Sequence, residues 1–121
     1  MEISKIQPTD NINFNSHLKT LFKKGKLNVK YGLYGEELTK KNVSDEHLIC
    51  KCQGGSNDLS NIALASKDLN NARGCSPIEN FITFGMVRQY LMQFKGIKAQ
   101  GFDGDAYIEG IKDTFRRIID D

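Results

Sequence analysis

The chain has 121 residues, of which 39% are hydrophobic and 26% are charged, and its formal net charge is +2. A chain of this length builds one hydrophobic core, and the composition excludes wholesale disorder, so we expect a single domain over residues 1–121. No apolar run approaches the roughly 18 residues that a membrane helix needs, and the first residues lack the pattern of a signal peptide. We therefore expect a cytoplasmic protein that does not contact a membrane.

Basic and acidic residues are distributed unevenly along the chain. Residues 19–30 hold five lysines and no acidic residue, whereas residues 101–121 hold three basic and six acidic residues. Such asymmetry indicates one face that approaches a polyanion, and a solvated, lysine-rich helix end is the alternative. From this segment we expect Lys23, Lys24 and Lys26 to contact nucleic acid.

The first half of the chain predicts a helix followed by a hairpin. Apolar residues at helical spacing ahead of Gly25 predict a short N-terminal helix over residues 15–24. The tyrosine- and glycine-rich residues 27–38 predict strand and turn. Apolar runs at residues 43–52 and 61–64 flank a stretch dense in turn-forming residues. These two runs predict a β-hairpin with a long polar loop.

Three helices are predicted after the hairpin. Ser66 is placed to cap a short helix that ends at Gly74, since serine is a common N-cap and glycine a common C-cap. The Ser-Pro-Ile-Glu sequence at residues 76–79 is a capping box with proline at the first helical position, so a second helix should begin there. The last helix should be capped by Asp105.

Apolar stripes on the two C-terminal helices are assigned to the core. The residues of these stripes are Phe84, Val87, Leu91 and Phe94 on one helix, and Ile108, Ile111, Phe115, Ile118 and Ile119 on the other. Asp103 and Asp105 resemble a D-x-D cation site, but a helix cap after a glycine loop is the preferred interpretation.

Residues 46–74 contain the residue types that phosphodiester hydrolysis uses. Glu46 supplies a hard oxygen ligand for a divalent cation, and Asn70 offers a neutral amide oxygen that adds no charge. His47 follows Glu46 and points to the opposite side of the strand, where its imidazole can take a proton from water. Asn61 can bridge the two strands of the hairpin through side-chain hydrogen bonds and hold the loop of the imidazole in shape.

This segment resembles the HNH endonuclease motif, a hairpin plus helix known as the ββα-metal or His-Me finger fold. The resemblance is carried by the Glu46–His47 pair, the loop GGSNDLSN and the final asparagine before a basic residue and glycine. It implies an α+β protein with a ββα-metal core over residues 43–74. An N-terminal helix and a helical extension over residues 76–121, with two C-terminal helices, would pack around that core.

The resemblance also implies roles for single residues. His47 would be the general base, with Asn61 as the supporting asparagine of the catalytic set. Glu46 and Asn70 would hold Mg²⁺ or Mn²⁺, and Asn71 is the alternative ligand if the register differs by one. Lys51, Lys67 and Arg73 flank the motif and would contact phosphates.

The function implied is metal-dependent hydrolysis of DNA phosphodiester bonds. Compact relatives of this kind are often phage-encoded, so a partner protein from a phage packaging system or a host is part of the expectation. The alternative is a catalytically weak or inactive HNH-fold module that binds nucleic acid or a phage or host protein. A nuclease acting on RNA or on structured DNA is a third option.

Many members of that family carry two CxxC pairs that bind a structural zinc ion. The corresponding positions here hold Tyr31, Tyr34, Ser66 and Leu69, so we expect no structural zinc. Cys50, Cys52 and Cys75 are an odd number of cysteines in a chain without an export signal, and we expect them to be reduced. A zinc site made from these three is the alternative, but the C-x-C spacing matches the usual zinc spacings poorly.

Overall fold

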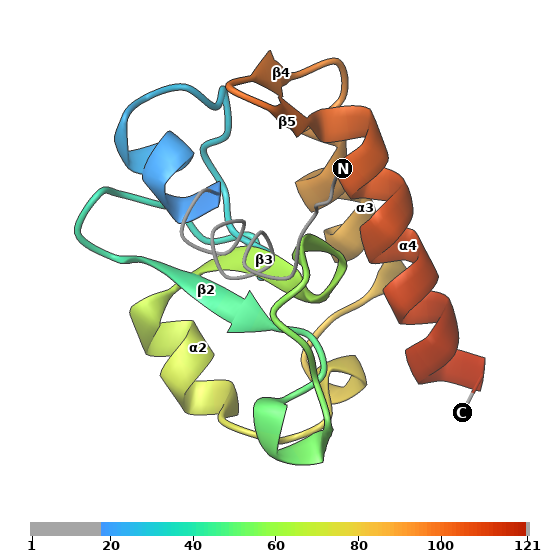
Figure 1. Ribbon diagram of the computed structural model, residues 1–121. Helices are drawn as coiled ribbons and strands as arrows, with labels where there is room; N and C mark the ends of the chain where they lie inside the picture. Colours follow the sequence, from blue (N-terminus) through green and yellow to red (C-terminus); the bar gives the residue numbers. More distant parts are fainter. Residues whose placement is uncertain (1–17, 121) are drawn as a thin grey trace.

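A computed structural model describes residues 18–120 of the chain (Figure 1). Residues 18–23 are helical, as predicted, whereas residue 24 lies in a turn; residues 15–17 of the predicted helix lie outside the described residues. The elements that follow are strand β2 (Val43–His47), strand β3 (Ile62–Ser66), helix α2 (Lys67–Arg73), helix α3 (Phe84–Met92), strands β4 (Lys98–Ala99) and β5 (Phe102–Asp103), and helix α4 (Gly104–Asp120). Short 3-10 turns occur at Lys51–Gln53, Leu59–Asn61 and Ile78–Asn80. The predicted mixed α+β class is confirmed.

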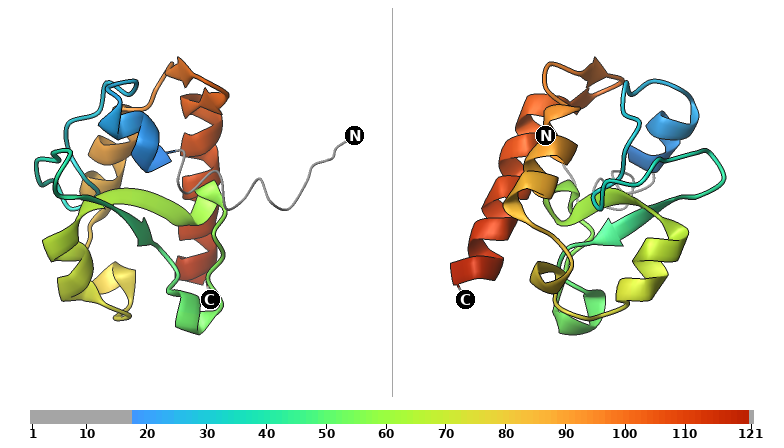
Figure 2. Two further views of the ribbon diagram at one scale, coloured as in Figure 1. Left: turned by 60° about the vertical axis from the view of Figure 1, so that its left-hand side comes forward. Right: turned by 180° about the vertical axis from the view of Figure 1, so that it is seen from behind.

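The antiparallel pair β2–β3 lies at the centre of the fold, as the hairpin prediction required. Its register pairs Val43 with Ser66 and His47 with Ile62. Every residue of β3 is buried, because α2 covers one side of the hairpin and the helical residues 18–23 lie on the other (Figures 1 and 2). A strand covered in this way is apolar throughout, which accounts for the sequence Ile-Ala-Leu-Ala along β3.

Two tyrosine hydroxyls close the edge of β3 that faces away from β2. The Leu64 N–H donates to the hydroxyl of Tyr90, from α3, at 2.8 Å. The hydroxyl of Tyr107, from α4, donates to the Ile62 carbonyl at 2.6 Å, and the two hydroxyls are 2.9 Å apart. These side chains take the place of a third strand and fix α3 and α4 against the hairpin.

The segment before β2 completes the same edge. The Leu33 N–H donates to the Leu64 carbonyl at 2.9 Å, and the Ser66 N–H donates to Oε2 of Glu36 at 2.7 Å. A sheet edge with unpaired backbone groups is a site of aggregation, so this cover protects a hairpin of only two strands.

Helix α2 begins and ends where the sequence predicts. The Ser66 hydroxyl accepts a hydrogen bond from the Leu69 N–H at 3.3 Å and caps the first turn. Gly74 has φ +57°, a conformation that glycine adopts more easily than other residues, and its N–H donates to the Asn70 carbonyl.

Helix α3 begins later than predicted. Pro77 is extended and Ile78–Asn80 forms a 3-10 turn, so the capping box at residues 76–79 does not start the helix. The cap is Thr83, whose hydroxyl accepts a hydrogen bond from the Met86 N–H at 3.2 Å. The helix therefore starts at the next residue that combines an extended backbone with a side-chain acceptor.

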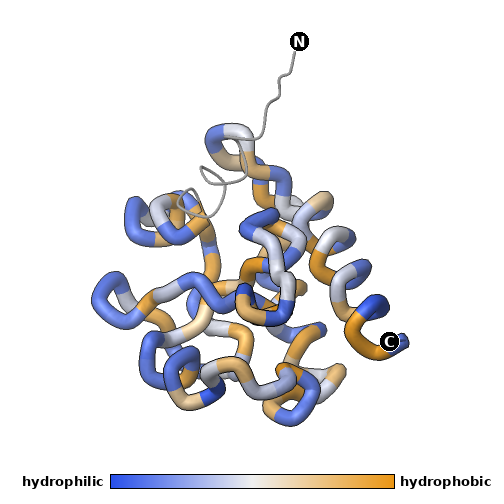
Figure 3. Tube along the Cα trace, turned by 60° about the horizontal axis from the view of Figure 1, so that its bottom comes forward, coloured by the Kyte–Doolittle hydropathy of each residue, from blue (hydrophilic) through white to orange (hydrophobic). Residues whose placement is uncertain are grey.

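The predicted core stripes are confirmed only in part. Leu91, Phe94, Ile111 and Phe115 are buried, but Phe84 is 75% and Ile119 is 53% exposed. Both exposed residues line an open apolar groove between α3 and α4. In Figure 3, hydrophobic and hydrophilic stretches alternate along the helix that ends at the C-terminus, as expected when one face packs on the core.

The cap of α4 is Asp103, and the prediction of Asp105 was wrong. Oδ1 of Asp103 accepts from the N–H groups of Asp105 and Ala106, while Oδ1 of Asp105 accepts from the Gly96 N–H. Lys98 pairs with the other oxygen of Asp103 at 2.8 Å. Within residues 18–120, no helix has the length and apolar character required to cross a membrane.

The tyrosine pair gives a first prediction. Replacing Tyr107→Phe should lower the free energy of unfolding by about 1–3 kcal/mol, because the buried Ile62 carbonyl loses its donor. The control is Tyr31→Phe. Tyr31 is 51% exposed, so removing its hydroxyl should change the free energy of unfolding by less than about 0.5 kcal/mol. Urea denaturation of both variants checks this, and equal effects would contradict the role assigned to Tyr107.

Candidate functional site

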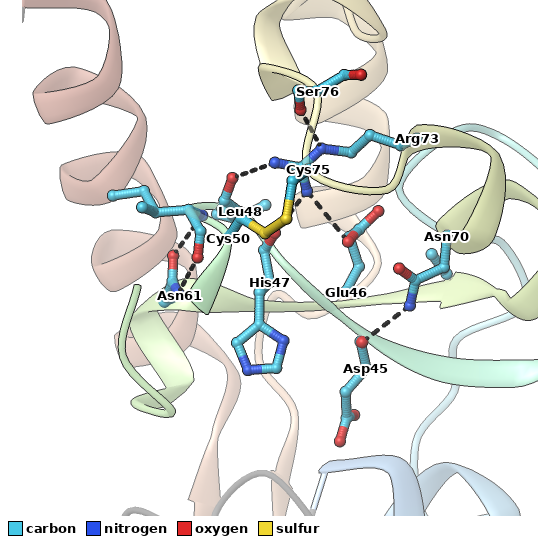
Figure 4. Close-up of polar contacts among 12 residues, drawn as sticks. Asp45, Glu46, His47, Leu48, Cys50, Asn61, Asn70, Arg73, Cys75 and Ser76 are labelled. Carbon is cyan, nitrogen blue, oxygen red and sulfur yellow. Dashed lines mark hydrogen bonds and ion pairs between the residues drawn. A yellow bond between two sulfur atoms is a disulfide. The ribbon is translucent and has the colours of Figure 1, made fainter. Parts of the chain in front are cut away.

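The side chains of β2 alternate between the two faces of the hairpin. Ser44 and Glu46 face α2, because Asn70 and Arg73 of that helix bond to them. Asp45 and His47 leave the strand on the opposite side, as Figure 4 shows. The structure therefore brings Glu46 and Asn70 to one face and places the imidazole of His47 on the other.

Glu46 is buried and both of its carboxylate oxygens are hydrogen-bonded. Nη1 of Arg73 lies 3.1 Å from Oε1, and the hydroxyl of Tyr34 donates to Oε2 at 2.6 Å. Glu46 is 2% exposed and Arg73 is 3% exposed. Burial raises the pKa of Glu46, and the Tyr34 hydrogen bond and the Arg73 charge offset part of that rise. Burial together with the Glu46 hydrogen bond raises the pKa of Tyr34, which keeps its proton and acts as a donor.

Arg73 also binds three backbone carbonyls. Its guanidinium donates to the carbonyls of His47 at 2.5 Å, Leu48 at 2.8 Å and Ser76 at 2.7 Å (Figure 4). The planar fork of donors suits such a site, and lysine could not span it. The prediction that Arg73 contacts phosphates was wrong, because its side chain is used inside the protein. Lys51, Lys67, Lys23, Lys24 and Lys26 are exposed.

Asn70 contacts the hairpin from α2. Its amide nitrogen donates to the Ser44 hydroxyl at 3.0 Å and to the Asp45 carbonyl at 2.9 Å. Both bonds use the nitrogen, so within the described residues the amide oxygen remains available as an acceptor. Asn71 is exposed, and it is Asn70 that faces the hairpin.

The Glu46 and Asn70 side chains fit a divalent cation only in part. The amide oxygen of Asn70 is a suitable hard ligand. The carboxylate of Glu46 is not open to a cation, because a guanidinium already neutralises Oε1 and a hydroxyl occupies Oε2. A second positive charge beside Arg73 would be repelled unless the ion pair were first broken.

The imidazole of His47 is oriented by Asn57, for which the sequence predicted only a place in the turn-forming loop. Nε2 of His47 lies 2.9 Å from Oδ1 of Asn57. An amide oxygen can only accept, so in the neutral imidazole Nε2 carries the proton and Nδ1 carries the lone pair. His47 is half-buried, so part of the residue remains accessible to solvent. No periodicity in the sequence could have revealed this contact, since it joins two parts of a loop-bearing hairpin.

Asn61 shapes the hairpin loop, in agreement with the bridging role expected of it. The residue is 3% exposed, and its amide oxygen accepts from the Ile49 N–H at 2.8 Å. Its amide nitrogen donates to the carbonyls of Ile49 at 3.0 Å and Ser56 at 2.9 Å. Gly55 is required here, because a Cβ at that residue would lie 1.7 Å from the Ile49 carbonyl oxygen.

Asp45 shares the face of His47. Its Oδ1 is buried and has no hydrogen-bond partner within residues 18–120. Burial raises the pKa of Asp45, while the charges of Lys19 and His47 lower it in part. Lys19 therefore lies within electrostatic reach of this face, which places the start of the lysine-rich segment on the side of the hairpin that carries His47.

The three cysteines are not all free. Cys50 and Cys75 form a disulfide across a sequence separation of 25 residues. Cys52 is exposed and is the free cysteine among the described residues. The expectation of three reduced cysteines was wrong for this structure. The chain after α2 returns to the hairpin loop and brings Cys75 to Cys50, and the spacing of the cysteines in the sequence does not show that return.

Comparisons with protein-family models, with curated proteins and with solved structures found no match to this chain. The resemblance to the HNH motif therefore rests on the sequence of residues 46–74, and the function drawn from it stays a prediction.

The buried ion pair gives a second prediction. Arg73→Met should lower the free energy of unfolding by about 3–5 kcal/mol, because it leaves the Glu46 carboxylate buried without a positive charge beside it. Adding Glu46→Gln to that variant should recover part of the loss, since it removes the buried charge. The cycle is measured by urea denaturation, with Lys67→Met on the same helix as an exposed control. A coupling energy near zero would contradict the pairing.

Proposed function

We propose that this protein hydrolyses phosphodiester bonds of DNA, with His47 as the general base. The observation that carries the proposal is the state of its imidazole. Oδ1 of Asn57 lies 2.9 Å from Nε2, so in the neutral ring Nε2 is the donor and Nδ1 can accept a proton from an attacking water molecule. The hairpin followed by α2 also agrees with the ββα arrangement that the motif implies.

The charges around His47 support approach of a phosphate backbone. Lys19 acts on the same face of the hairpin, and the exposed Lys23, Lys24 and Lys26 follow it in the chain. Lys51 is exposed in the hairpin loop that carries Asn57. Contacts of this kind position a duplex without reading its sequence, so binding should weaken steeply as salt rises.

The resemblance implies Mg²⁺ or Mn²⁺ held by Glu46 and Asn70. A cation of that kind would supply charge neutralisation at the scissile phosphate. Because Glu46 is already paired with Arg73 and Tyr34, no step of the proposed reaction is assigned to a metal ion. What the described residues supply is the base at His47, its orientation by Asn57 and the shape of the loop set by Asn61.

A second candidate function is favoured by the same ion pair. Because Glu46 is the partner of Arg73, its carboxylate is not open to a cation, and on this second proposal the chain is a non-cleaving module that binds nucleic acid or a partner protein of a phage or its host. The exposed lysines serve this function as well as the first. The two candidates differ in whether His47 is needed for a chemical step.

A third prediction separates the two candidates. The protein should nick supercoiled plasmid in the presence of Mg²⁺ or Mn²⁺, and His47→Ala should reduce the rate by about 10²–10⁴-fold because the base is lost. Agarose gels of plasmid incubated with each ion, or with EDTA, measure the rate.

The control for cation binding compares the nicking rates of Asn70→Ala and Asn71→Ala. Asn71 is the exposed neighbour, so the Asn71→Ala variant should retain nicking activity. Circular dichroism shows whether each variant is folded. Plasmid binding without nicking, with the same affinity in wild type and His47→Ala, would support the binding module and contradict the nuclease.

A fourth prediction concerns Asn57 as a positioning residue. Asn57→Leu should lower the nicking rate by about 10-fold, because one hydrogen bond to the ring is lost. Long-range ¹H–¹⁵N spectra at alkaline pH should show the Nε2–H tautomer of His47 in the wild type and a mixture of tautomers in the variant. A single unchanged tautomer in Asn57→Leu would show that Asn57 does not orient the ring.

A further inference from the structure

The sulfur atoms of all three cysteines converge at one point of the fold. Sγ of Cys52 lies 3.2 Å from Sγ of Cys50 and 2.9 Å from Sγ of Cys75, and the three sulfur atoms lie within 4.8 Å of one another. Cys50 and Cys52 flank the start of the turn Lys51–Gln53, and Cys75 follows α2. A disulfide uses two of these atoms and leaves the third in contact with both.

The backbone that carries the cysteines is held in place by local hydrogen bonds. The Cys50 carbonyl accepts from the N–H groups of Gln53 at 2.8 Å and Gly55 at 3.0 Å. On the other side, Arg73 donates to the Ser76 carbonyl next to Cys75. The three side chains therefore converge from ordered backbone, which lowers the entropic cost of binding a common ligand.

We propose that the reduced protein binds a soft divalent cation, Zn²⁺, through the thiolates of Cys50, Cys52 and Cys75. A tetrahedral zinc ion lies about 2.3 Å from each sulfur, which separates the sulfur atoms by about 3.8 Å, so modest side-chain rotations create the site. Cys50 is half-buried and the other two are exposed, so the fourth position opens to solvent and takes water. Within residues 18–120, no further histidine, cysteine or carboxylate joins this group.

Zinc binding and the disulfide exclude each other. When the ion binds, three thiols release their protons to solvent and three Zn–S bonds form, with no change in oxidation state. The C-x-C spacing alone argued against zinc, and the tertiary placement of Cys75 is what reverses that argument. Occupied, the site links the hairpin loop to the segment after α2, next to Arg73. The proposal does not depend on nuclease activity.

The fifth prediction tests the site with the metal alone. The full chain, reduced with a phosphine and freed of metal, is titrated with Co²⁺ in the absence of oxygen. We expect the intense near-ultraviolet band of thiolate-to-cobalt charge transfer and the visible bands of a tetrahedral ion. One equivalent of Zn²⁺ should displace the cobalt, and native mass spectrometry should show one zinc ion per chain.

Cys52→Ser is the decisive variant, because the exposed Cys52 is outside the disulfide. It should weaken Zn²⁺ binding at least about tenfold and lower the charge-transfer intensity, whereas Ser76→Ala beside Cys75 should change neither. Zn²⁺ should also raise the melting temperature of the reduced wild type more than that of Cys52→Ser. If the folded, reduced wild type takes up no Co²⁺, or if Cys52→Ser binds equally well, the proposal is overturned and the cluster is a disulfide with a neighbouring thiol.

Discussion

The arrangement around the hairpin depends on the hydrogen bonds and ion pair of the Arg73 guanidinium. It sits at the end of α2, almost fully buried, and its donors reach the Glu46 carboxylate and the carbonyls of His47, Leu48 and Ser76. A buried charge is costly unless every partner is in place. The same side chain thus fixes the end of β2, the direction of α2 and the path of the chain beyond it.

That constraint separates the hairpin into two chemically different faces. The face toward α2 holds Glu46 in a closed network with Arg73 and Tyr34. The other face carries Asp45 and His47, with Lys19 acting on it from the N-terminal helical residues. The imidazole of His47 lies on the second face, and the first face is occupied by structural contacts. Any cation at Glu46 must compete with an arginine that holds the fold together.

Elsewhere in the molecule, side chains form hydrogen bonds to backbone groups that a further strand would otherwise satisfy. Tyr90 and Tyr107 replace a third strand at the edge of β3, and Asn61 replaces a ladder bond inside the hairpin loop. The cysteines Cys50 and Cys75 join that loop to the chain after α2. A two-stranded hairpin is marginal by itself, so these contacts supply the stability that a larger sheet would otherwise provide.

The sequence by itself determined the local elements: the hairpin runs, the Ser66 cap of α2, its end at Gly74 and the mixed α+β class. These follow from nearest-neighbour chemistry, which is written in adjacent residues. Only the tertiary structure decided the partner of Glu46, the orientation of His47 by Asn57 and the meeting of the cysteines. The contacts Glu46–Arg73, His47–Asn57 and Cys50–Cys75 each join residues at least ten apart in the chain. Burial decides whether Arg73 meets a phosphate or a carboxylate, and burial is a property of packing that residue type does not encode.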